Sequence, residues 1–332
     1  MAGADAPSRK DPAALVARML AGDRLALARL ITHVENRTDA VPAIMRAVHA
    51  RAQQAYLIGV TGPPGAGKST VVDRLTATLR AAGRTVGIVA VDPSSPFTGG
   101  AVLGDRIRMQ THVLDPGVFI RSMATRGAVG GLARATGNAA KLMAAFGLDR
   151  VLIETVGVGQ TELDVMKLAD TTVVVLVPES GDAIQTMKAG LMEAADVFVV
   201  NKADRGGAPA LMAELKFAAH LAYTSPAARS DVDWEIPVLA TEAQSGVGVE
   251  ELLATIERHR ATLEAAGALA ERRRARRREE LRGLLVEQLT ASVERRLASG
   301  DLARTFEDVA EGRLDPYSAA EAVLRVLSLK TP

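Results

Sequence analysis

The sequence predicts an α/β fold with a mostly parallel, doubly wound sheet and helical extensions at both ends. From residue 56 onward, short apolar runs alternate with amphipathic stretches, as strands and crossover helices do in parallel sheets. The runs are aliphatic or β-branched on both faces, which is typical of strands buried between two layers of helices. Before residue 55 and after residue 248 the apolar residues follow a helical period.

Composition limits the classes of function that the chain can have. It has 332 residues, 48% apolar and 24% charged, enough for one large α/β domain with additions. A net charge of +1 and an aromatic content of 3% argue against nucleic acid as a partner. Cysteine is absent, which excludes disulfides and thiolate metal sites. The polar start lacks the apolar stretch of a signal peptide, and no apolar run reaches the roughly 18 residues of a membrane span. We therefore expect a soluble, cytoplasmic protein.

Residues 1–54 are predicted to form an N-terminal helical extension. Apolar residues recur there at three- and four-residue spacing, and Pro12 stands where the first turn of a helix tolerates proline. The recurring residues are Leu15, Val16, Met19, Leu20, Leu27, Leu30 and Ile31.

Residues 55–265 are predicted to form the α/β domain itself. Strand and helix patterns alternate through this stretch at the spacing of a doubly wound sheet. The expected strands are residues 56–61, 85–91, 118–121, 151–154, 172–177, 197–200 and 237–240.

A phosphate-binding motif follows the first expected strand. Residues 62–69 match G-x-x-x-x-G-K-[ST] in full, between a strand and a helical pattern. Glycines let backbone N–H groups wrap a phosphate, and the helix N-terminus adds partial positive charge. Lys68 is predicted to reach the β- and γ-phosphates, and the Ser69 hydroxyl to ligate Mg²⁺. The expected nucleotide contacts are Gly62, Pro63, Pro64, Gly65, Ala66, Gly67, Lys68, Ser69 and Thr70. A glycine- and proline-rich turn that binds nothing is the alternative.

A second motif, Asn201-Lys202-Ala203-Asp204, predicts that the base is guanine. It directly follows the strand 197–200, at the sheet edge where nucleotide bases lie. A carboxylate at Asp204 accepts from N1–H and the 2-amino group of guanine, whereas adenine offers neither pattern. Asn201 is expected to support the loop, and the Lys202 stem to cover the ring. An ordinary surface turn is the alternative. The two motifs together predict a P-loop GTPase domain.

The end of the last expected strand adds further candidate contacts to the base. Ala240, Thr241, Glu242 and Ala243 lie there, placed to offer a backbone N–H to guanine O6.

Two acids end expected strands at the edge where Mg²⁺ and the γ-phosphate belong. Asp92 follows the strand 85–91, and Glu154 ends the strand 151–154. Gly157, three residues after Glu154, is placed to offer its N–H to the γ-phosphate. The alternative for both acids is a carboxylate that caps a loop.

The stretch after Asp92 predicts a switch loop. Residues 93–104 are rich in glycine, serine and proline, and Asp105 follows them. A helix N-cap is the alternative role for Asp105. Many GTPases carry a glutamine directly after the glycine that corresponds to Gly157, where it orients the attacking water. Val158 takes that position and Gln160 is the nearest glutamine, so unassisted hydrolysis is expected to be slow.

Residues 266–332 are predicted to form a C-terminal helical arm. The run of arginines at 272–278 is flanked by glutamates, which favours a solvated or interfacial helix face over a nucleic-acid site. A long apolar stripe follows, interpreted as a dimer surface or as one side of a helical hairpin that closes on itself. The stripe consists of Leu281, Leu284, Leu285, Leu289, Val293 and Leu297.

Five motifs together resemble the MeaB type of GTPase, with its bacterial ArgK-named and mitochondrial relatives. They read GPPGAGKST, VDPSSPFTGGAVLGDR, IETVGVGQTE, PESGDAIQTMKAG and NKAD, from the phosphate-binding motif through Asp204. The resemblance implies a homodimeric chaperone for methylmalonyl-CoA mutase, which gates loading of adenosylcobalamin, the cofactor of the mutase, and protects that enzyme from inactivation. It also implies that Mg²⁺ and the catalytic shell involve Ser69, Asp92, Asp105 and Glu154. Lys68, from the phosphate-binding motif, completes the predicted catalytic residues. Asp182, Gln185 and Lys188 would lie in a third switch loop that communicates with the mutase.

Other functions fit the sequence less well. A GTP-dependent kinase or regulator linked to arginine and ornithine transport is the main alternative. However, no motif indicates a pocket for the acceptor of a phosphoryl group. A signal-recognition-type targeting GTPase would bring a methionine-rich arm, and the ten methionines are scattered. A nickel or cobalt insertion GTPase would need a cluster of His and Cys, whereas the five histidines are dispersed.

Overall fold

A parallel sheet of seven strands organises the part of the chain that our computed structural model describes. The described residues are 11–52, 55–92, 110–124, 131–155, 166–179, 194–224, 232–300 and 302–326. The strands are β1 (Tyr56–Thr61), β2 (Val86–Asp92), β3 (Val118–Ala124), β4 (Arg150–Thr155), β5 (Thr171–Leu176), β6 (Val197–Asn201) and β7 (Val238–Thr241). Their order is β3-β2-β4-β1-β5-β6-β7, and every neighbouring pair is parallel. The predicted fold class is therefore confirmed.

The order of the strands determines where a ligand can meet several strand ends. β1 lies between β4 and β5. From β1 the chain passes to β2, β3 and β4, which all lie on one side of β1, and it then crosses to β5 on the other side. In open parallel sheets, ligands bind at the carboxyl ends of strands where the winding changes direction in this way. Here these ends carry Thr61, Thr155 and Asn201.

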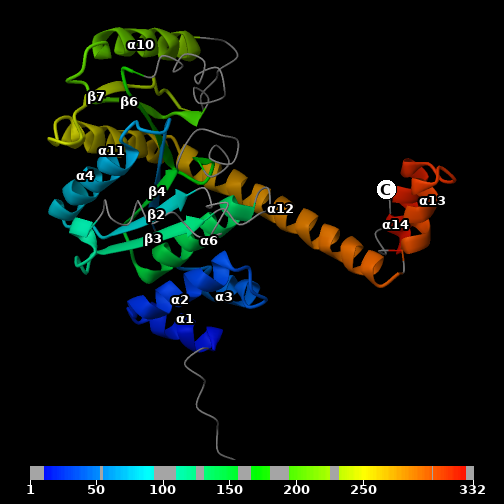
Figure 1. Cartoon of the computed structure of the whole chain (residues 1–332). Coiled ribbons are helices and arrows are strands. Elements are labelled where there is room, and N and C mark those ends of the chain that lie inside the picture. Colours follow the sequence, from blue (N-terminus) through cyan, green and yellow to red (C-terminus); the bar gives the residue numbers. More distant parts are fainter. Residues whose placement is uncertain are drawn as a thin grey trace, which may run out of the picture. The chain divides into compact units, whose positions relative to one another are not determined.

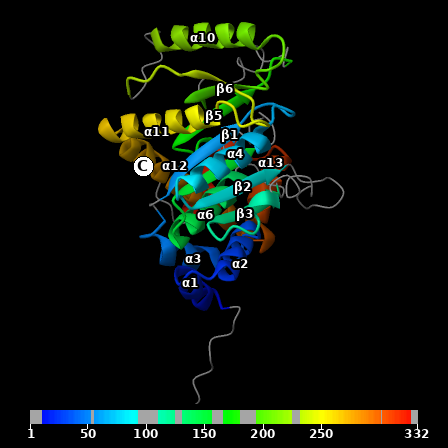
Figure 2. The ribbon, with the colours of Figure 1, turned by 90° about the vertical axis from the view of Figure 1, so that its left-hand side faces the viewer.

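Helices cover both faces of the sheet (Figures 1 and 2). α4 (Lys68–Ala81) and α11 (Val249–Ala265) pack on one face, where Val173 and Val175 of β5 join their core. α6 (Gly131–Phe146) and α10 (Ala208–Thr224) pack on the other, where Val174 and Leu176 point toward α10. Alternate residues of one strand thus enter opposite cores, as expected for strands buried on both sides.

Three N-terminal helices extend the core around α6. They are α1 (Pro12–Leu20), α2 (Arg24–Glu35) and α3 (Val41–Val48), and their buried side chains join those of α6 in one apolar cluster. The Asp11 side chain caps α1, and the Asp23 side chain caps α2 by accepting from the N–H groups of Leu25 and Ala26 at 2.9 and 3.1 Å.

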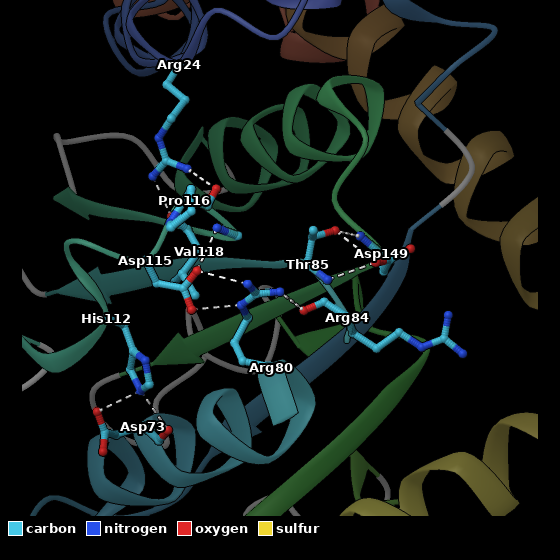
Figure 3. Close-up of polar contacts among 11 residues, drawn as sticks. Arg24, Asp73, Arg80, Arg84, Thr85, His112, Asp115, Pro116, Val118 and Asp149 are labelled. Atoms are coloured by element: carbon cyan, nitrogen blue, oxygen red, sulfur yellow. Dashed lines mark hydrogen bonds and ion pairs between the residues drawn. The ribbon is translucent and has the colours of Figure 1, made fainter. Parts of the chain in front are cut away.

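Arginine side chains secure the edge strand β3 at its amino end (Figure 3). Arg24 of α2 donates to the carbonyl oxygen of Pro116 at 2.7 Å and to that of Val118. Arg80 of α4 forms a two-bonded ion pair with Asp115, at 2.8 and 2.9 Å. An edge strand leaves backbone groups without strand partners, and Arg24 satisfies two of the carbonyls there.

The chain divides into two compact units, Met1–Leu269 and Ala270–Pro332. The second holds most of α12 (Ala268–Ala298), α13 (Ala303–Ala310) and α14 (Pro316–Val326). Leu281 and Leu285 of α12 are 58% and 51% exposed. The described residues therefore leave these two leucines of the stripe uncovered, which argues against a hairpin that closes over them. Within the described residues, none of the helices combines the length and apolarity needed to cross a membrane.

Candidate nucleotide site

Residues 62–67, called the phosphate loop below, connect the end of β1 to the start of α4. Two positions require glycine. A Cβ at Gly62 would lie 2.0 Å from the carbonyl oxygen of Val175, and a Cβ at Gly67 would lie 2.4 Å from the amide nitrogen of the Asn201 side chain. Both residues also have positive φ, 145° and 86°. The glycines therefore let the phosphate loop pass close to β5 and to the end of β6.

Lys68 bends back over the phosphate loop that precedes it. Its Nζ donates to the carbonyl oxygens of Gly62 at 2.8 Å and Pro63 at 2.9 Å, and the residue is buried. These contacts hold the ammonium beside the backbone that would wrap a phosphate. A cation in that position is what the motif uses to neutralise the β- and γ-phosphates.

Ser69 meets Glu154 at the start of α4. The register of β1 and β4 sets Val60 beside Glu154, so the acid lies next to the phosphate loop. The Ser69 Oγ donates to Glu154 Oε1 at 2.6 Å, and both residues are buried. The sequence predicted both as Mg²⁺ ligands, and the structure brings the two oxygens together.

The chemistry of this pair fits Mg²⁺. The ion prefers oxygen ligands, and nucleotide sites hold it through one or two protein groups together with phosphate oxygens and water. The described residues contain no cluster of three or more His, Cys, Asp or Glu that could hold a metal by itself. A P-loop site does not need one. Asp92 ends β2 at the same edge of the sheet, one residue after Val91, which pairs with Thr155 of β4.

Asn201 connects the phosphate loop with the ends of β6 and β7. Its Nδ2 donates to the carbonyl oxygen of Ala66 at 2.9 Å. Its Oδ1 accepts from the Thr241 hydroxyl and from the Ala243 N–H, each at 3.1 Å. The residue is only 3% exposed. One buried amide therefore connects three segments. Its role in a nucleotide site stays a prediction.

Residues 201–205, called the base-reading loop below, are also tied to the phosphate loop by Lys202. Its Nζ donates to the carbonyl oxygen of Gly65 at 2.9 Å, and its backbone has a φ of 56°. The left-handed conformation is uncommon for a residue with a side chain. By contrast, Asp204 is exposed, and within the described residues its carboxylate has no hydrogen bond or ion pair. That carboxylate is available to a ligand.

Backbone N–H groups just after β7 already donate to other groups of the chain. The Glu242 N–H donates to the carbonyl oxygen of Val247 at 3.0 Å, and the Ala243 N–H donates to Asn201. Two of the N–H groups expected near guanine O6 thus already have acceptors. The role of Ala240 to Ala243 in contacting the base stays a prediction.

Seven residues singled out in the sequence lie outside the described residues. They are Asp105, Gly157, Val158, Gln160, Asp182, Gln185 and Lys188.

Two contacts at this edge were not predicted. Arg74 of α4 donates to the carbonyl oxygens of Ala243 at 3.1 Å and Gln244 at 2.7 Å, so α4 also holds the loop after β7. Arg205 forms an ion pair with Glu179 at 2.6 Å. The hydrogen bond from Arg205 lowers the pKa of Glu179 and raises the pKa of Arg205 itself. For Arg205, adjacency to Asp204 was the one signal in the sequence.

A family model described as "Methylmalonyl Co-A mutase-associated GTPase MeaB" matches residues 27–298 of the chain. A relative from Pyrococcus abyssi that carries the name of a GTPase is 50% identical over 311 residues, which cover 94% of this chain and 95% of the relative. A mouse protein named "Methylmalonic aciduria type A homolog, mitochondrial" is 32% identical over 323 residues, covering 92% of this chain and 77% of that protein.

One solved structure resembles the chain over nearly its whole length. The crystal structure of a "LAO/AO transport system kinase" matches with a TM-score of 0.70 and 26% sequence identity. The match covers 98% of this chain and 100% of the other.

Proposed function

Because the chain belongs to the MeaB family of methylmalonyl-CoA mutase-associated GTPases, we propose that it is a GTP-hydrolysing switch for methylmalonyl-CoA mutase. In this proposal the protein acts in the cytoplasm, gates the loading of adenosylcobalamin into the mutase and protects the mutase from inactivation. Adenosylcobalamin belongs to the partner and not to this chain. The coarser conclusion, that the chain is a P-loop GTPase, follows from the family and the fold.

The observation that best supports this function is the direct connection between the phosphate loop and the base-reading loop. Asn201 reaches Ala66 and Lys202 reaches Gly65, both at 2.9 Å. The two loops that a guanine nucleotide contacts are thus one connected structure. A preorganised site of this kind loses less conformational entropy when the nucleotide binds.

The proposed hydrolysis depends on positioning and charge, because phosphoryl transfer needs little covalent chemistry from the protein. Lys68 neutralises the β- and γ-phosphates, and the Gly157 N–H donates to the γ-phosphate. The proposed ligands of Mg²⁺ are Ser69, Asp92, Asp105 and Glu154. Bound Mg²⁺ supplies positive charge that stabilises the phosphate oxygens as the bond to GDP breaks.

The rate of hydrolysis is proposed to depend on the partner. Val158 occupies the position at which many GTPases carry a glutamine that orients the attacking water. The isolated protein therefore turns over slowly, and the mutase raises the rate through a switch loop that contains Asp182, Gln185 and Lys188. The family description and the name of the mouse relative both point to methylmalonyl-CoA metabolism and support this choice of partner.

A paired measurement tests the proposal. GTP turnover is measured with and without purified methylmalonyl-CoA mutase, and the affinity between the two proteins is measured with GDP and with a non-hydrolysable GTP analogue. We expect nucleotide-dependent binding and faster turnover in the complex. If the mutase neither binds nor alters turnover, the choice of partner is wrong, while the GTPase activity itself can still be measured in the isolated protein.

A kinase is the second candidate, because the matched solved structure is titled a transport system kinase. A kinase transfers the γ-phosphoryl group to an acceptor, whereas a GTPase transfers it to water. With γ-labelled GTP and added arginine or ornithine, the switch proposal predicts that all label appears as inorganic phosphate. Label on the amino acid would favour the kinase.

A further inference from the structure

We propose that Glu179 is a specificity-determining residue of the guanine site, which keeps the Asp204 carboxylate available to the base by holding Arg205. This inference rests on the proposed function, because it explains how the base-reading loop keeps its preference for guanine. Glu179 acts through Arg205 and does not itself touch the nucleotide, so it is a positioning residue.

The contact joins the end of β5 to the base-reading loop. Arg205 Nη1 lies 2.6 Å from Glu179 Oε1, and each side chain is 50% exposed. Glu179 follows β5 by three residues, whereas Arg205 follows Asp204 directly. The backbone supports the same approach, because a Cβ added at Gly207 would lie in ordinary contact with Pro178, at 3.5 Å.

Arg205 interacts with two carboxylates, and it forms its ion pair with only one of them, that of Glu179. The pKa of Arg205 is raised first by its hydrogen bond to Glu179 and also by the charge of Asp204. The Asp204 carboxylate is exposed and, within the described residues, forms no hydrogen bond or ion pair, so Arg205 and Asp204 interact only through their charges. It would therefore pair with Arg205 if Glu179 were absent. A carboxylate that accepts from a guanidinium has fewer acceptor sites left for the N1–H and 2-amino groups of guanine.

The neighbouring cation cannot replace Arg205 in this arrangement. Lys202 contributes to the lowered pKa of Glu179 through its charge, after the larger effect of Arg205. Its Nζ, however, is hydrogen-bonded to the carbonyl oxygen of Gly65 at 2.9 Å on the phosphate loop. Glu179 is thus the acid that holds Arg205, and Lys202 stays with the phosphate loop.

The size of the effect follows from the exposure of the groups. Without Glu179, Arg205 and Asp204 would form an exposed ion pair of ordinary strength, and GDP would have to break this pair in order to bind. GDP binding should therefore weaken about two- to sixfold. The loss should shrink at high salt, because exposed charges are screened.

The test compares GDP with IDP, which lacks the 2-amino group, in binding titrations at low ionic strength with Mg²⁺. We expect Glu179→Ala and Glu179→Gln to weaken GDP binding about two- to sixfold and to lower the preference for GDP over IDP. The double variant Glu179→Ala/Arg205→Ala should recover both. Glu264→Ala is the matched control, because Glu264 is 47% exposed and pairs with Arg260 at 2.7 Å on α11. It should bind both nucleotides as the unmodified protein does.

Two results would overturn the inference. One is unchanged GDP affinity and GDP preference in both Glu179 variants. The other is a loss that the double variant does not recover, since Glu179 would then act without Arg205. Failure of the guanine assignment looks different: the unmodified protein would itself bind GDP no better than IDP or ADP.

Discussion

Side chains that bond to backbone carbonyls organise the candidate site at the scale of single residues. Lys68, Asn201 and Lys202 donate to carbonyl oxygens of residues 62–66, so the phosphate loop is held without a ligand present. The motifs predicted these residue types at these positions. They did not predict that Asn201 and Lys202 would bind this loop, because these residues lie 135 and 137 positions from their acceptors and periodicity carries no such information.

Asp204→Asn should change which base is bound. A side-chain amide donates where the carboxylate accepted, so it opposes the guanine N1–H and 2-amino groups and suits the carbonyl at position 2 of xanthine. We expect GDP affinity to fall by about two orders of magnitude or more, with a gain for XDP. Competition titrations with GDP, XDP and ADP measure this. ADP binding equal to that of GDP in the unmodified protein would contradict the guanine assignment.

Ser69→Ala should remove most of the Mg²⁺ dependence of nucleotide binding. The variant lacks the hydroxyl that lies 2.6 Å from Glu154, and a lost ligand weakens a metal site by at least about tenfold. The measurement is the GDP dissociation constant with Mg²⁺ and with EDTA. Thr78→Ala is the control, since Thr78 carries an exposed hydroxyl on the same helix. An equal Mg²⁺ effect in Ser69→Ala and in the control would remove Ser69 from the metal site.

At the scale of elements, the sequence predicted the strands well and their boundaries less well. All seven expected runs are strands. β7 begins at Val238 and not at Pro237, because proline has no N–H to give to a ladder. β3 continues to Ala124, beyond the expected end at residue 121. Ser122 and Ala124 lack apolar bulk, so hydrophobic patterning alone does not mark them as strand.

The order of the strands in the sheet could not be predicted from the sequence. β4 lies between β2 and β1 because of pairings such as Val60 with Glu154, which join residues about ninety positions apart. The same pairing brings Glu154 to Ser69. Motif spacing predicted that both residues belong to one edge of the sheet, while the hydrogen bond between them depends on the register of two strands.

The connection between α4 and β3 provides a stability prediction. Arg80 and Asp115 are about one-quarter exposed and share two hydrogen bonds (Figure 3). Asp115→Asn should lower the free energy of unfolding by about 1 kcal/mol at neutral pH. Gly117→Ala should have a similar effect, because its Cβ would lie 2.1 Å from the guanidinium carbon of Arg80. The two substitutions should not be additive, since both break one contact. Urea unfolding of both single variants and the double variant measures this.

The effect of Asp115→Asn should depend on pH. Hydrogen bonds from Arg80 and from the Gly117 N–H lower the pKa of Asp115 in the folded protein. A lowered folded pKa contributes stability above the unfolded pKa of about 3.9, and this contribution is lost as the pH falls through the folded value. The difference between the unmodified protein and Asp115→Asn should therefore be full near pH 7 and shrink below about pH 4. A difference that stays constant would contradict the assignment.

At the scale of the whole molecule, signalling to a partner is the first proposal to test. Lys188→Ala should leave GDP and GTP affinity nearly unchanged and weaken the stimulation of hydrolysis by the mutase. The reason is that Lys188 belongs to the proposed switch loop and not to the phosphate loop or the base-reading loop. Matched measurements are nucleotide dissociation constants and turnover with and without the mutase. Normal stimulation in Asp182→Ala, Gln185→Ala and Lys188→Ala alike would remove this loop from the mechanism.

The apolar stripe of α12 is proposed to be the surface on which two copies of the chain associate. Leu281, Leu285 and Leu289 lie at four-residue intervals, and each is at least 41% exposed, which is unusual for a row of leucines on a soluble helix. Leu285→Glu places a charge within this row and should convert the expected dimer to a monomer, as measured by sedimentation or light scattering. Nucleotide affinity should not change, because Leu285 lies outside the phosphate loop and the base-reading loop.

Glu294→Lys is the control for that substitution, because it also changes a charge on α12, at an exposed residue that lies nine positions after Leu285 and therefore on the opposite face of the helix. It should leave the dimer intact. Glutamate and lysine are both good helix formers, so the control tests the position of the charge change and not the stability of α12. If the unmodified protein is a monomer, or if both substitutions leave a dimer, the stripe is not the contact between copies. A dimer that persists in Leu285→Glu and separates in Glu294→Lys would transfer the contact to the opposite face of α12.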